Sequence, residues 1–163
     1  MYRSENKKQQ KLSDFYLPFG GHLNEDNRWV ILSKMIPWDD LEQDYEKKFS
    51  AEGMGAPAKS LRIALGSLII KEKFSLTDEE VVEHIRETPY LQYFLGFEGY
   101  RDERPFDPSL MVYFRKRLDG ELLRKANELL VGEYQEQLRK KKPKRWKRMQ
   151  RKTKRMEQKT KDN

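Results

Sequence analysis

Three consecutive cations, Arg115–Arg117, stand near the end of a segment that reads F-D-P-S-L-M-V-Y-F-R-K-R-L (106–118). Asp107 is a candidate N-cap. Pro108 suits the first helical position, where its missing N–H costs nothing. The segment therefore predicts a short helix that starts at Asp107. Cations on the outside of such a helix are suited to contact the phosphates and base edges of DNA.

The spacing of apolar residues divides this predicted helix into two faces. At about 100° per residue, Leu110, Phe114 and Leu118 share one side, with Met111 beside them. A buried face opposite a basic, partly aromatic face is what a DNA-recognition helix needs. The alternative is an ordinary surface helix with a solvated basic face. The candidate DNA-binding residues on the outer face and its flanks are Ser109, Val112, Tyr113, Arg115, Lys116 and Arg117.

The net charge of +7 is distributed very unevenly along the chain. Residues 139–163 hold 14 of the 34 Lys and Arg residues and only 2 of the 27 acidic residues, a net charge of +12. Residues 1–138 hold the other 20 Lys and Arg residues and the other 25 acidic residues, a net charge of −5. Such a basic tail is expected to be disordered alone and to bind nucleic acid electrostatically. It has no apolar face to insert into a membrane. The alternative is a solvated tail that touches nucleic acid only incidentally. Its candidate DNA-binding residues are Lys140, Lys141, Lys142, Lys144, Arg145, Lys147 and Arg148.

The sequence predicts three parts: an N-terminal arm (1–23), a helical domain (24–138) and the basic tail (139–163). The arm carries an apolar patch, F-Y-L-P-F-G-G, which we expect to pack on the body or on a partner subunit. No segment is a convincing strand, so we expect an all-α, compact multi-helix bundle. The predicted helices are 24–36, 39–50 with Asp39 as its cap, 57–74, one that follows a capping box at Thr77–Glu80, 89–96, 107–118 and 120–142.

Two of these helices differ from the others in their apolar pattern. The helix at 57–74 is apolar on most faces, which is typical of the buried centre of a bundle. In the helix at 120–142, the residues expected to face inward are Leu122, Leu123, Ala126, Leu129, Leu130, Tyr134 and Leu138. The tight R-E-T-P turn, the loop after it and the basic helix predict a helix-turn-helix-like unit of three helices.

The sequence contains no recognisable catalytic or metal-binding motif. The acidic clusters Asp39–Glu42 and Asp78–Glu80 fall in first helical turns, where the helix dipole favours negative charge. His22 and His84 have no second ligand at a useful spacing, and no phosphate loop or nucleophile signature occurs. We therefore expect no catalytic residue, no metal and no cofactor.

Targeting signals are also missing from the sequence. The N-terminus is polar, and the longest apolar run, 63–70, is too short to span a bilayer. The absence of cysteine excludes disulfides and thiolate metal sites. We expect a cytoplasmic protein that does not associate with membranes.

Four sequence blocks in a fixed order resemble a known family: W-V-I-L-S-K-M-I-P-W-D-D-L-E, G-A-P-A-K-S-L-R-I-A-L-G-S-L-I-I-K-E-K, S-L-T-D-E-E-V-V-E-H-I-R-E-T-P-Y-L-Q-Y-F-L-G-F and the segment at 106–118. From Leu23 to Val131 the chain resembles the N-terminal domain of insertion-sequence DDE transposases of the InsH type. The resemblance implies recognition of the element's terminal inverted repeats. It places Ser109 and Arg115–Arg117 against DNA, and Phe114 and Leu118 in the core.

The chain departs from this family in its C-terminal part. In the family, an RNase H-like domain with three metal-binding acidic residues follows, and no Asp or Glu of this chain corresponds to them. We therefore expect a fragment truncated before the catalytic domain, which is not an enzyme and competes with full-length transposase for the repeats. Its expected partners are DNA and either full-length transposase or a second copy. The alternatives are a subunit-interaction module, built from the arm and Pro89–Gly96, and a non-functional remnant.

The composition of the tail suggests how such a fragment could arise. The family's linker at this place tends to be acidic or mixed, whereas this tail is strongly basic. Acidic codons such as GAA and GAT give Arg, Lys, Met and Trp when they are read one base out of frame, and the tail is rich in these residues. We hypothesise that residues from about Lys142 onward are a shifted-frame product of a longer gene. The hypothesis requires that another frame downstream encodes the catalytic domain.

Overall fold

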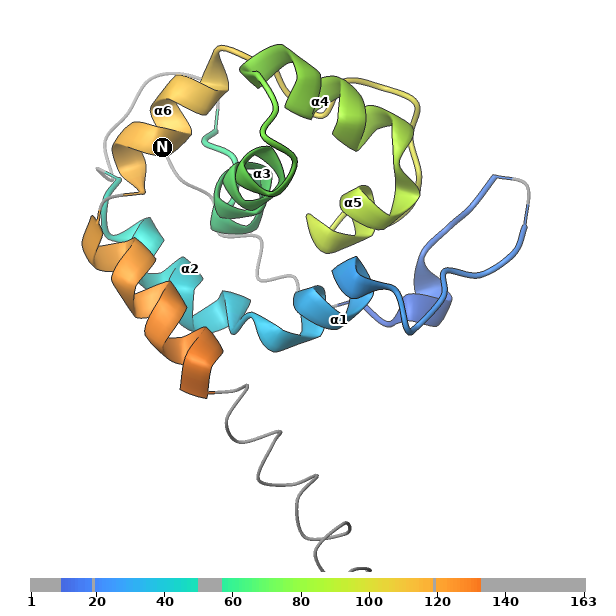
Figure 1. Ribbon diagram of the computed structural model, residues 1–163, viewed down its shortest axis with the longest axis horizontal. Coiled ribbons are helices and arrows are strands. Elements are labelled where there is room, and N and C mark those ends of the chain that lie inside the picture. Colours follow the sequence, from blue (N-terminus) through green and yellow to red (C-terminus); the bar gives the residue numbers. More distant parts are fainter. Residues whose placement is uncertain (1–9, 19, 50–56, 119, 133–163) are drawn as a thin grey trace, which may run out of the picture.

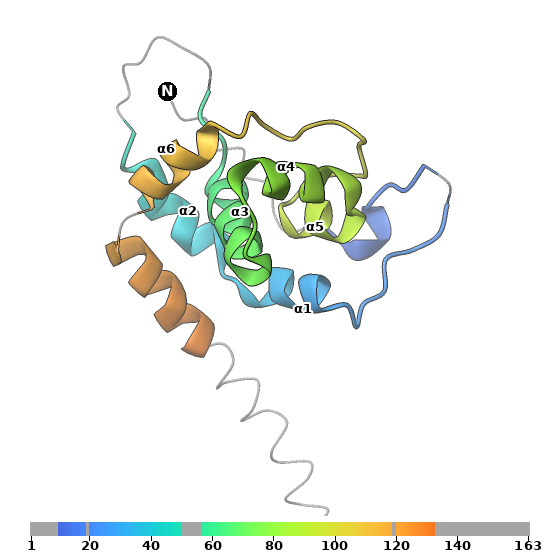
Figure 2. The ribbon, with the colours of Figure 1, turned by 45° about the horizontal axis from the view of Figure 1, so that its top comes forward.

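The computed structural model describes residues 10–18, 20–49, 57–118 and 120–132, and within them it is a helical fold without strands (Figures 1 and 2). This confirms the predicted all-α class. One isolated parallel bridge pairs Tyr16 with Gly99. The elements are the 3-10 helix η1 (Leu12–Asp14) and the α-helices α1 (Arg28–Met35), α2 (Trp38–Glu46), α3 (Leu61–Phe74), α4 (Asp78–Glu87), α5 (Pro89–Phe94) and α6 (Leu110–Arg117), followed by a helical segment at 120–132.

Helix α3 is the centre of the fold, as its apolar sequence predicted. It packs against α2, α4 and α6, and Figure 1 shows these helices around it. The helix begins at Leu61 rather than at Pro57, because the Ser60 side chain accepts a hydrogen bond from the Ile63 amide at 3.3 Å and so caps it. Its buried residues are Leu61, Ala64, Leu65, Gly66, Ser67 and Ile70.

The described part of the N-terminal arm packs on the body, which was one of the two expected positions. Phe15 and Leu23 form a small second core with Val30 of α1 and Tyr93 of α5. The Tyr93 ring meets Phe15 edge-on at 5.6 Å. The Tyr16 amide and carbonyl pair with the backbone on either side of Gly99. The arm therefore fixes the chain that leads into the loop before α6.

The first two helices start at other residues than predicted. Helix α1 begins at Arg28 instead of Asn24, because the Asn27 side chain caps it by accepting from the Trp29 amide at 2.9 Å. Helix α2 begins at Trp38, with Pro37 in the N-cap position. Asp39 therefore lies inside the first turn and is not the cap, although its charge still suits the helix dipole there.

The capping box that the sequence predicted at the start of α4 is confirmed. The Thr77 hydroxyl accepts from the Glu80 amide at 3.2 Å, and the Glu80 carboxylate accepts from the Thr77 amide at 2.7 Å. Helix α5 follows directly after Thr88, with Pro89 in its first turn. These local signals place Asp78 in the first turn of α4, where it becomes important for α6.

The segment at 120–132 buries a narrower face than predicted. Leu122 and Ala126 are buried in the core, and Leu129 and Leu130 pack against it. Leu123 is 42% exposed, so its predicted inward position is wrong. It lies about 100° round the helix from Leu122, outside the buried stripe. Tyr134 and Leu138 lie outside the described residues.

The expected helix-turn-helix-like unit is not confirmed. It required the α4–α5 pair and the basic helix to form one unit of three helices. Instead, α6 packs mainly on α3, whereas α5 packs on α1 and α4. Figure 2 likewise shows α6 beside α3, at the other end of the fold from α5.

Candidate nucleic-acid interface

A buried glutamine, Gln92, holds the loop that leads into α6. The Gln92 side-chain amide donates to the carbonyl oxygens of Ile85, Arg86 and Arg101 at 3.1, 2.9 and 2.8 Å. Its carbonyl oxygen accepts from the Arg101 amide at 2.8 Å. Since buried polar groups are costly to leave unpaired, this network ties the loop to the junction of α4 and α5.

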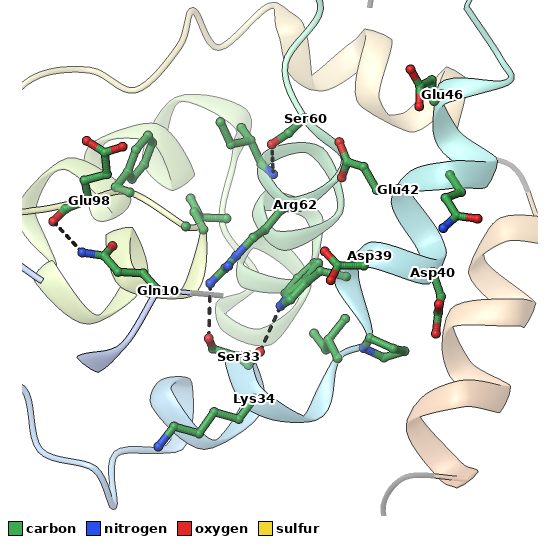
Figure 3. Close-up of a pocket in the computed structure, with 18 of the residues that line it drawn as sticks. Gln10, Ser33, Lys34, Asp39, Asp40, Glu42, Glu46, Ser60, Arg62 and Glu98 are labelled. Carbon is green, nitrogen blue, oxygen red and sulfur yellow. Dashed lines mark hydrogen bonds between the residues drawn. The ribbon is translucent and has the colours of Figure 1, made fainter. Parts of the chain in front are cut away.

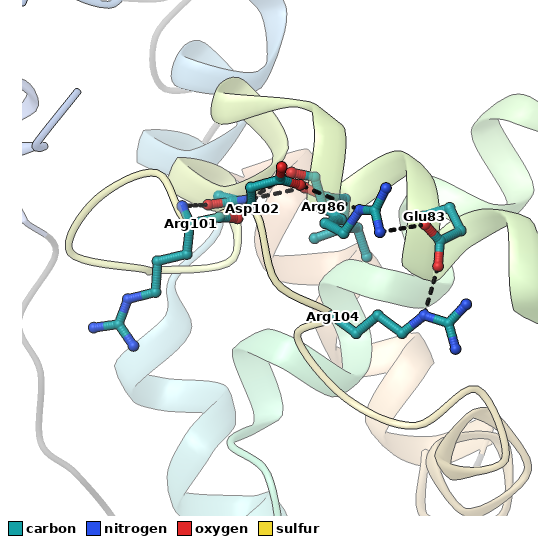
Figure 4. A network of polar contacts seen from close by, with 7 residues as sticks. Glu83, Arg86, Arg101, Asp102 and Arg104 are labelled. Atoms are coloured by element: carbon teal, nitrogen blue, oxygen red, sulfur yellow. Dashed lines mark hydrogen bonds and ion pairs between the residues drawn. The ribbon is translucent and has the colours of Figure 1, made fainter. Parts of the chain in front are cut away.

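Partly exposed ion pairs surround this network. Glu83 pairs with Arg104 at 2.6 Å and with Arg86 at 3.3 Å, and Arg86 also lies 3.4 Å from Asp102. Figure 4 shows Glu83 between Arg86 and Arg104, with the Arg101 guanidinium directed away from them. Ion pairs that solvent reaches contribute little stability, so the buried Gln92 amide is the stronger anchor.

The start of α6 differs from the predicted start. The helix begins at Leu110, with Ser109 in the N-cap position, so Asp107 is not the N-cap. Asp107 instead makes a turn just before the helix, in which its carboxylate accepts from the Ser109 amide at 2.9 Å. Hydrogen bonding to Ser109 lowers the pKa of Asp107. The bonds from the Leu110 and Met111 amides run to carbonyls three residues back, so the first turn is tighter than an α-helical turn.

The inner face of α6 is buried, as its periodicity predicted. Phe114 and Leu118 are buried, and Met111 is fully buried, whereas Leu110 is only partly buried. The buried face is therefore centred on Met111 and Phe114. The Phe114 ring meets Phe106 at 5.3 Å with an interplanar angle of 72°, a favourable edge-to-face arrangement. This packing makes α6 a rigid element.

The outer face of α6 carries apolar, aromatic and cationic groups together. Val112 is 41% exposed and Tyr113 is 51% exposed, and Ser109 and Lys116 are also exposed. Within the described part of the chain, Lys116 forms no ion pair. It is therefore available to a phosphate, without first giving up a partner.

Arg115 is held by a carboxylate on another helix. Its two terminal nitrogens lie 2.8 Å from the two oxygens of Asp78, in the first turn of α4. Lys71 of α3 lies 3.1 Å from the same carboxylate. The hydrogen bond from Arg115, and that from Lys71, lower the pKa of Asp78 to about 2. Asp78 is therefore a carboxylate anion at neutral pH.

Arg117 lies against aromatic rings. Its guanidinium carbon is 4.9 Å from the centre of the Phe49 ring and 5.8 Å from that of Tyr113, distances at which cation–π attraction operates. Arg117 also faces Tyr45, whose pKa is raised by burial, an effect that the positive charge partly offsets. The three adjacent cations of α6 thus have three different environments.

A hollow with an acidic lining lies elsewhere on the molecule (Figure 3). It is an open groove of about 930 Å³, bordered by α2, the start of α3 and the end of α5. Two cations, Lys34 and Arg62, also line it. An excess of carboxylates repels phosphates, so this groove does not suit nucleic acid. Its carboxylates belong to Asp14, Asp39, Asp40, Glu42, Glu46 and Glu98.

Arg62 in this groove already has partners. It donates to the carbonyl oxygens of Phe94 at 2.8 Å and Tyr93 at 2.9 Å, and its guanidinium lies 5.2 Å from the Trp38 ring. Burial lowers its pKa to about 10, so it stays charged at neutral pH. Arg62 therefore caps the end of α5 instead of offering a free anion site. Nearby, burial raises the pKa of Glu42 to about 6, although the carboxylate accepts from the Leu61 amide at 3.2 Å.

The structure describes all six candidate residues of α6 and its start, but the seven predicted in the tail, Lys140–Arg148, lie outside the described residues. So does the proposed frame change at Lys142. The pairing of Asp78 with Arg115 was not predicted, because no local pattern indicates a contact between residues 37 positions apart. Arg101, an exposed cation in the loop before α6, was not predicted as a candidate either.

Two negative findings apply only to the described part of the chain. No group of three or more His, Cys, Asp or Glu residues there is arranged to hold a metal ion. Among the helices of this part, none is long and apolar enough to cross a membrane.

Comparisons with known proteins identify the family of this chain. A family model described as "Transposase domain (DUF772)" matches residues 18–117, which include α1 to α6. A curated protein of Rhizobium meliloti, "Uncharacterized protein ORF8 in nfe locus", is 36% identical over 96 residues. The matched region is 59% of this chain and 45% of that protein, so the chain spans less than half of this relative's length. No solved structure matches the chain. Since the family model covers more than half of the sequence and confirms the resemblance to transposases, this chain belongs to the DUF772 transposase domain family.

Proposed function

We propose that this chain is a DNA-binding part of a transposase and that it recognises the terminal inverted repeats of its element through the outer face of α6. The observation that carries the proposal is the position of Lys116 beside Val112 and Tyr113, on the exposed side of a helix whose other side is buried. A cation suits phosphate, and apolar groups suit thymine methyl groups and sugars.

The size of α6 fits this role. An α-helix with its side chains is about 10–12 Å in diameter, and the 8 residues of α6 extend about 12 Å along its axis. The major groove of B-DNA is about 12 Å wide and accepts one helix. Because Phe114 and Met111 hold α6 against the core, its outer side chains keep a fixed spacing along the groove.

We assign DNA binding, rather than DNA cleavage, to this part of the chain. Cleavage by the DDE mechanism requires acidic side chains that hold metal ions beside the scissile phosphate. The exposed groups of α6 are cationic, aromatic and apolar, which suits contact with DNA.

The experiment is a binding titration by fluorescence anisotropy with labelled duplexes. One duplex carries a terminal inverted repeat from beside the gene, and the other is a scrambled duplex of equal composition. We expect tighter binding to the repeat, and we expect Lys116→Ala and Tyr113→Ala to reduce this preference. Equal affinity of the wild-type chain for both duplexes would refute the proposal and favour the subunit-interaction alternative.

A further inference from the structure

The contact between Asp78 and Arg115 uses a particular edge of the guanidinium group. The terminal nitrogens Nη1 and Nη2 each donate to a different oxygen of the carboxylate, both at 2.8 Å. The carboxylate thereby occupies the Nη1–Nη2 edge of the guanidinium, in a bidentate arrangement that a phosphate could otherwise take. The Nε–H and the outer N–H of each terminal nitrogen remain for another acceptor.

Asp78 is fixed in place independently of Arg115. It lies in the first turn of α4, where the helix dipole stabilises its charge. Lys71 holds the same carboxylate at 3.1 Å, and Lys71 is itself anchored by donating to the Leu76 carbonyl at 2.6 Å. The carboxylate would therefore stay near α6 even if Arg115 moved away. Its negative charge would repel any phosphate that approached Arg115.

We propose that Asp78 is a specificity-determining residue of the α6 surface, because its charge neutralises Arg115 and repels phosphates, and its two hydrogen bonds hold the guanidinium with the Nε side free for a base. This inference rests on the proposed function. On DNA of arbitrary sequence, the Asp78 charge beside Arg115 disfavours a phosphate contact there. At the correct site, the fixed guanidinium offers Nε–H and a neighbouring N–H to a base edge.

The exposure of the pair fits this role. The Arg115 side chain is 42% exposed and that of Asp78 is 21% exposed. DNA can therefore reach the outer edge of the guanidinium while the carboxylate stays covered on the inner side. Asp78 acts through Arg115 and is a positioning residue, without a DNA contact of its own.

The test compares Asp78→Asn with Glu79→Gln in the full chain. Glu79 is the next residue on α4 and is exposed. Since Glu79→Gln removes the same single negative charge as Asp78→Asn, it is a matched control for general electrostatic effects. Affinity is measured for the repeat and the scrambled duplex over a range of salt concentrations. Thermal unfolding confirms that each variant is folded at the assay temperature.

We expect Asp78→Asn to bind the scrambled duplex more tightly than Glu79→Gln does. One added phosphate contact steepens the slope of log affinity against log salt by about 0.9, which corresponds to about eightfold in affinity at 0.1 M salt. The affinity of Asp78→Asn for the repeat should not exceed that of Glu79→Gln. The ratio of its affinities for the repeat and the scrambled duplex should therefore fall by about eightfold. In an Arg115→Ala background, the excess effect of Asp78→Asn should disappear.

Two results would overturn the inference. In one, Asp78→Asn and Glu79→Gln show the same affinity and salt slope on scrambled DNA. In the other, the excess effect of Asp78→Asn persists without Arg115. Failure of the proposed function is a separate result, because it would already appear as a lack of preference in the wild-type chain.

Discussion

The three cations of α6 should respond differently to replacement by alanine, although they are adjacent in sequence. Lys116→Ala removes an exposed side chain without an ion pair among the described residues, so the free energy of unfolding should change by less than about 0.5 kcal/mol. Its effect should appear in DNA binding. Removal of one phosphate contact lowers the salt slope, which is the slope of log affinity against log salt concentration, by about 0.9. The affinity at 0.1 M salt then falls about eightfold.

Arg117→Ala should act mainly on stability. The guanidinium lies against two rings, Phe49 at 4.9 Å and Tyr113 at 5.8 Å. Cation–π contacts at partly exposed sites contribute about 0.5–1 kcal/mol each, so we expect a decrease in stability of about 1–2 kcal/mol. Arg115→Ala should cost less than about 1 kcal/mol, because its bidentate pair with Asp78 is partly exposed to solvent.

The assays are urea unfolding, followed by circular dichroism, and anisotropy titrations at several salt concentrations. Lys34→Ala is the matched control, because Lys34 is an exposed lysine of α1 that lines the acidic groove. It removes the same charge and should leave the salt slope unchanged. If Lys34→Ala and Lys116→Ala weaken binding equally, DNA does not contact α6 specifically. If Arg117→Ala abolishes binding and leaves stability unchanged, our account of its environment is wrong.

Three further predictions concern the rest of the chain. Gly66→Ala should lower the free energy of unfolding by about 1–3 kcal/mol in urea titrations, because a Cβ there would collide with the Leu95 side chain; an unchanged midpoint would contradict this packing. Glu42 has a folded pKa of about 6, above its ordinary value of 4.5, so its contribution to stability is complete below pH 4.5 and is lost as pH rises through 6. The decrease is at most about 2 kcal/mol and is reduced by partial exposure; Glu42→Gln should remove this part of the pH profile, and an identical profile would refute the assignment. Deletion of 139–163 should lower the salt slope by about 0.9 for each phosphate that the tail neutralises, while preference for the repeat remains; disappearance of that preference would place recognition in the tail.

Local signals predicted most of the helices and their order. The Thr77–Glu80 capping box and Pro89 act over three or four residues, so the sequence alone indicates where α4 and α5 begin. The start of α6 was displaced because the Asp107 carboxylate accepts from the Ser109 amide in a tight first turn, and the regular α-helix begins only at Leu110. Leu123 was misplaced because it lies about 100° round the helix from Leu122, outside the stripe that Leu122 and Ala126 bury.

The contacts that shape the candidate interface could not be predicted from the sequence. Gln92 binds the loop nine residues further on, and Asp78 binds Arg115 37 residues further on. Both contacts depend on how the helices pack, which periodicity does not specify. The helical periodicity of α6 correctly separated a buried face from an exposed one. It could not show that Arg115 and Arg117 have partners, whereas Lys116 has no ion pair within the described residues.

The distribution of charge constrains how DNA could approach this chain. Residues 1–138 have a net charge of −5, and the groove beside α2 adds a local excess of carboxylates. Under the proposed function, long-range attraction of DNA comes from the tail, with its net charge of +12. Close contact is then proposed to depend on a few side chains of α6, where Asp78 already neutralises one of three cations. Under the proposed function, attraction and sequence recognition reside in different segments, so mutations should change the salt dependence and the sequence preference independently.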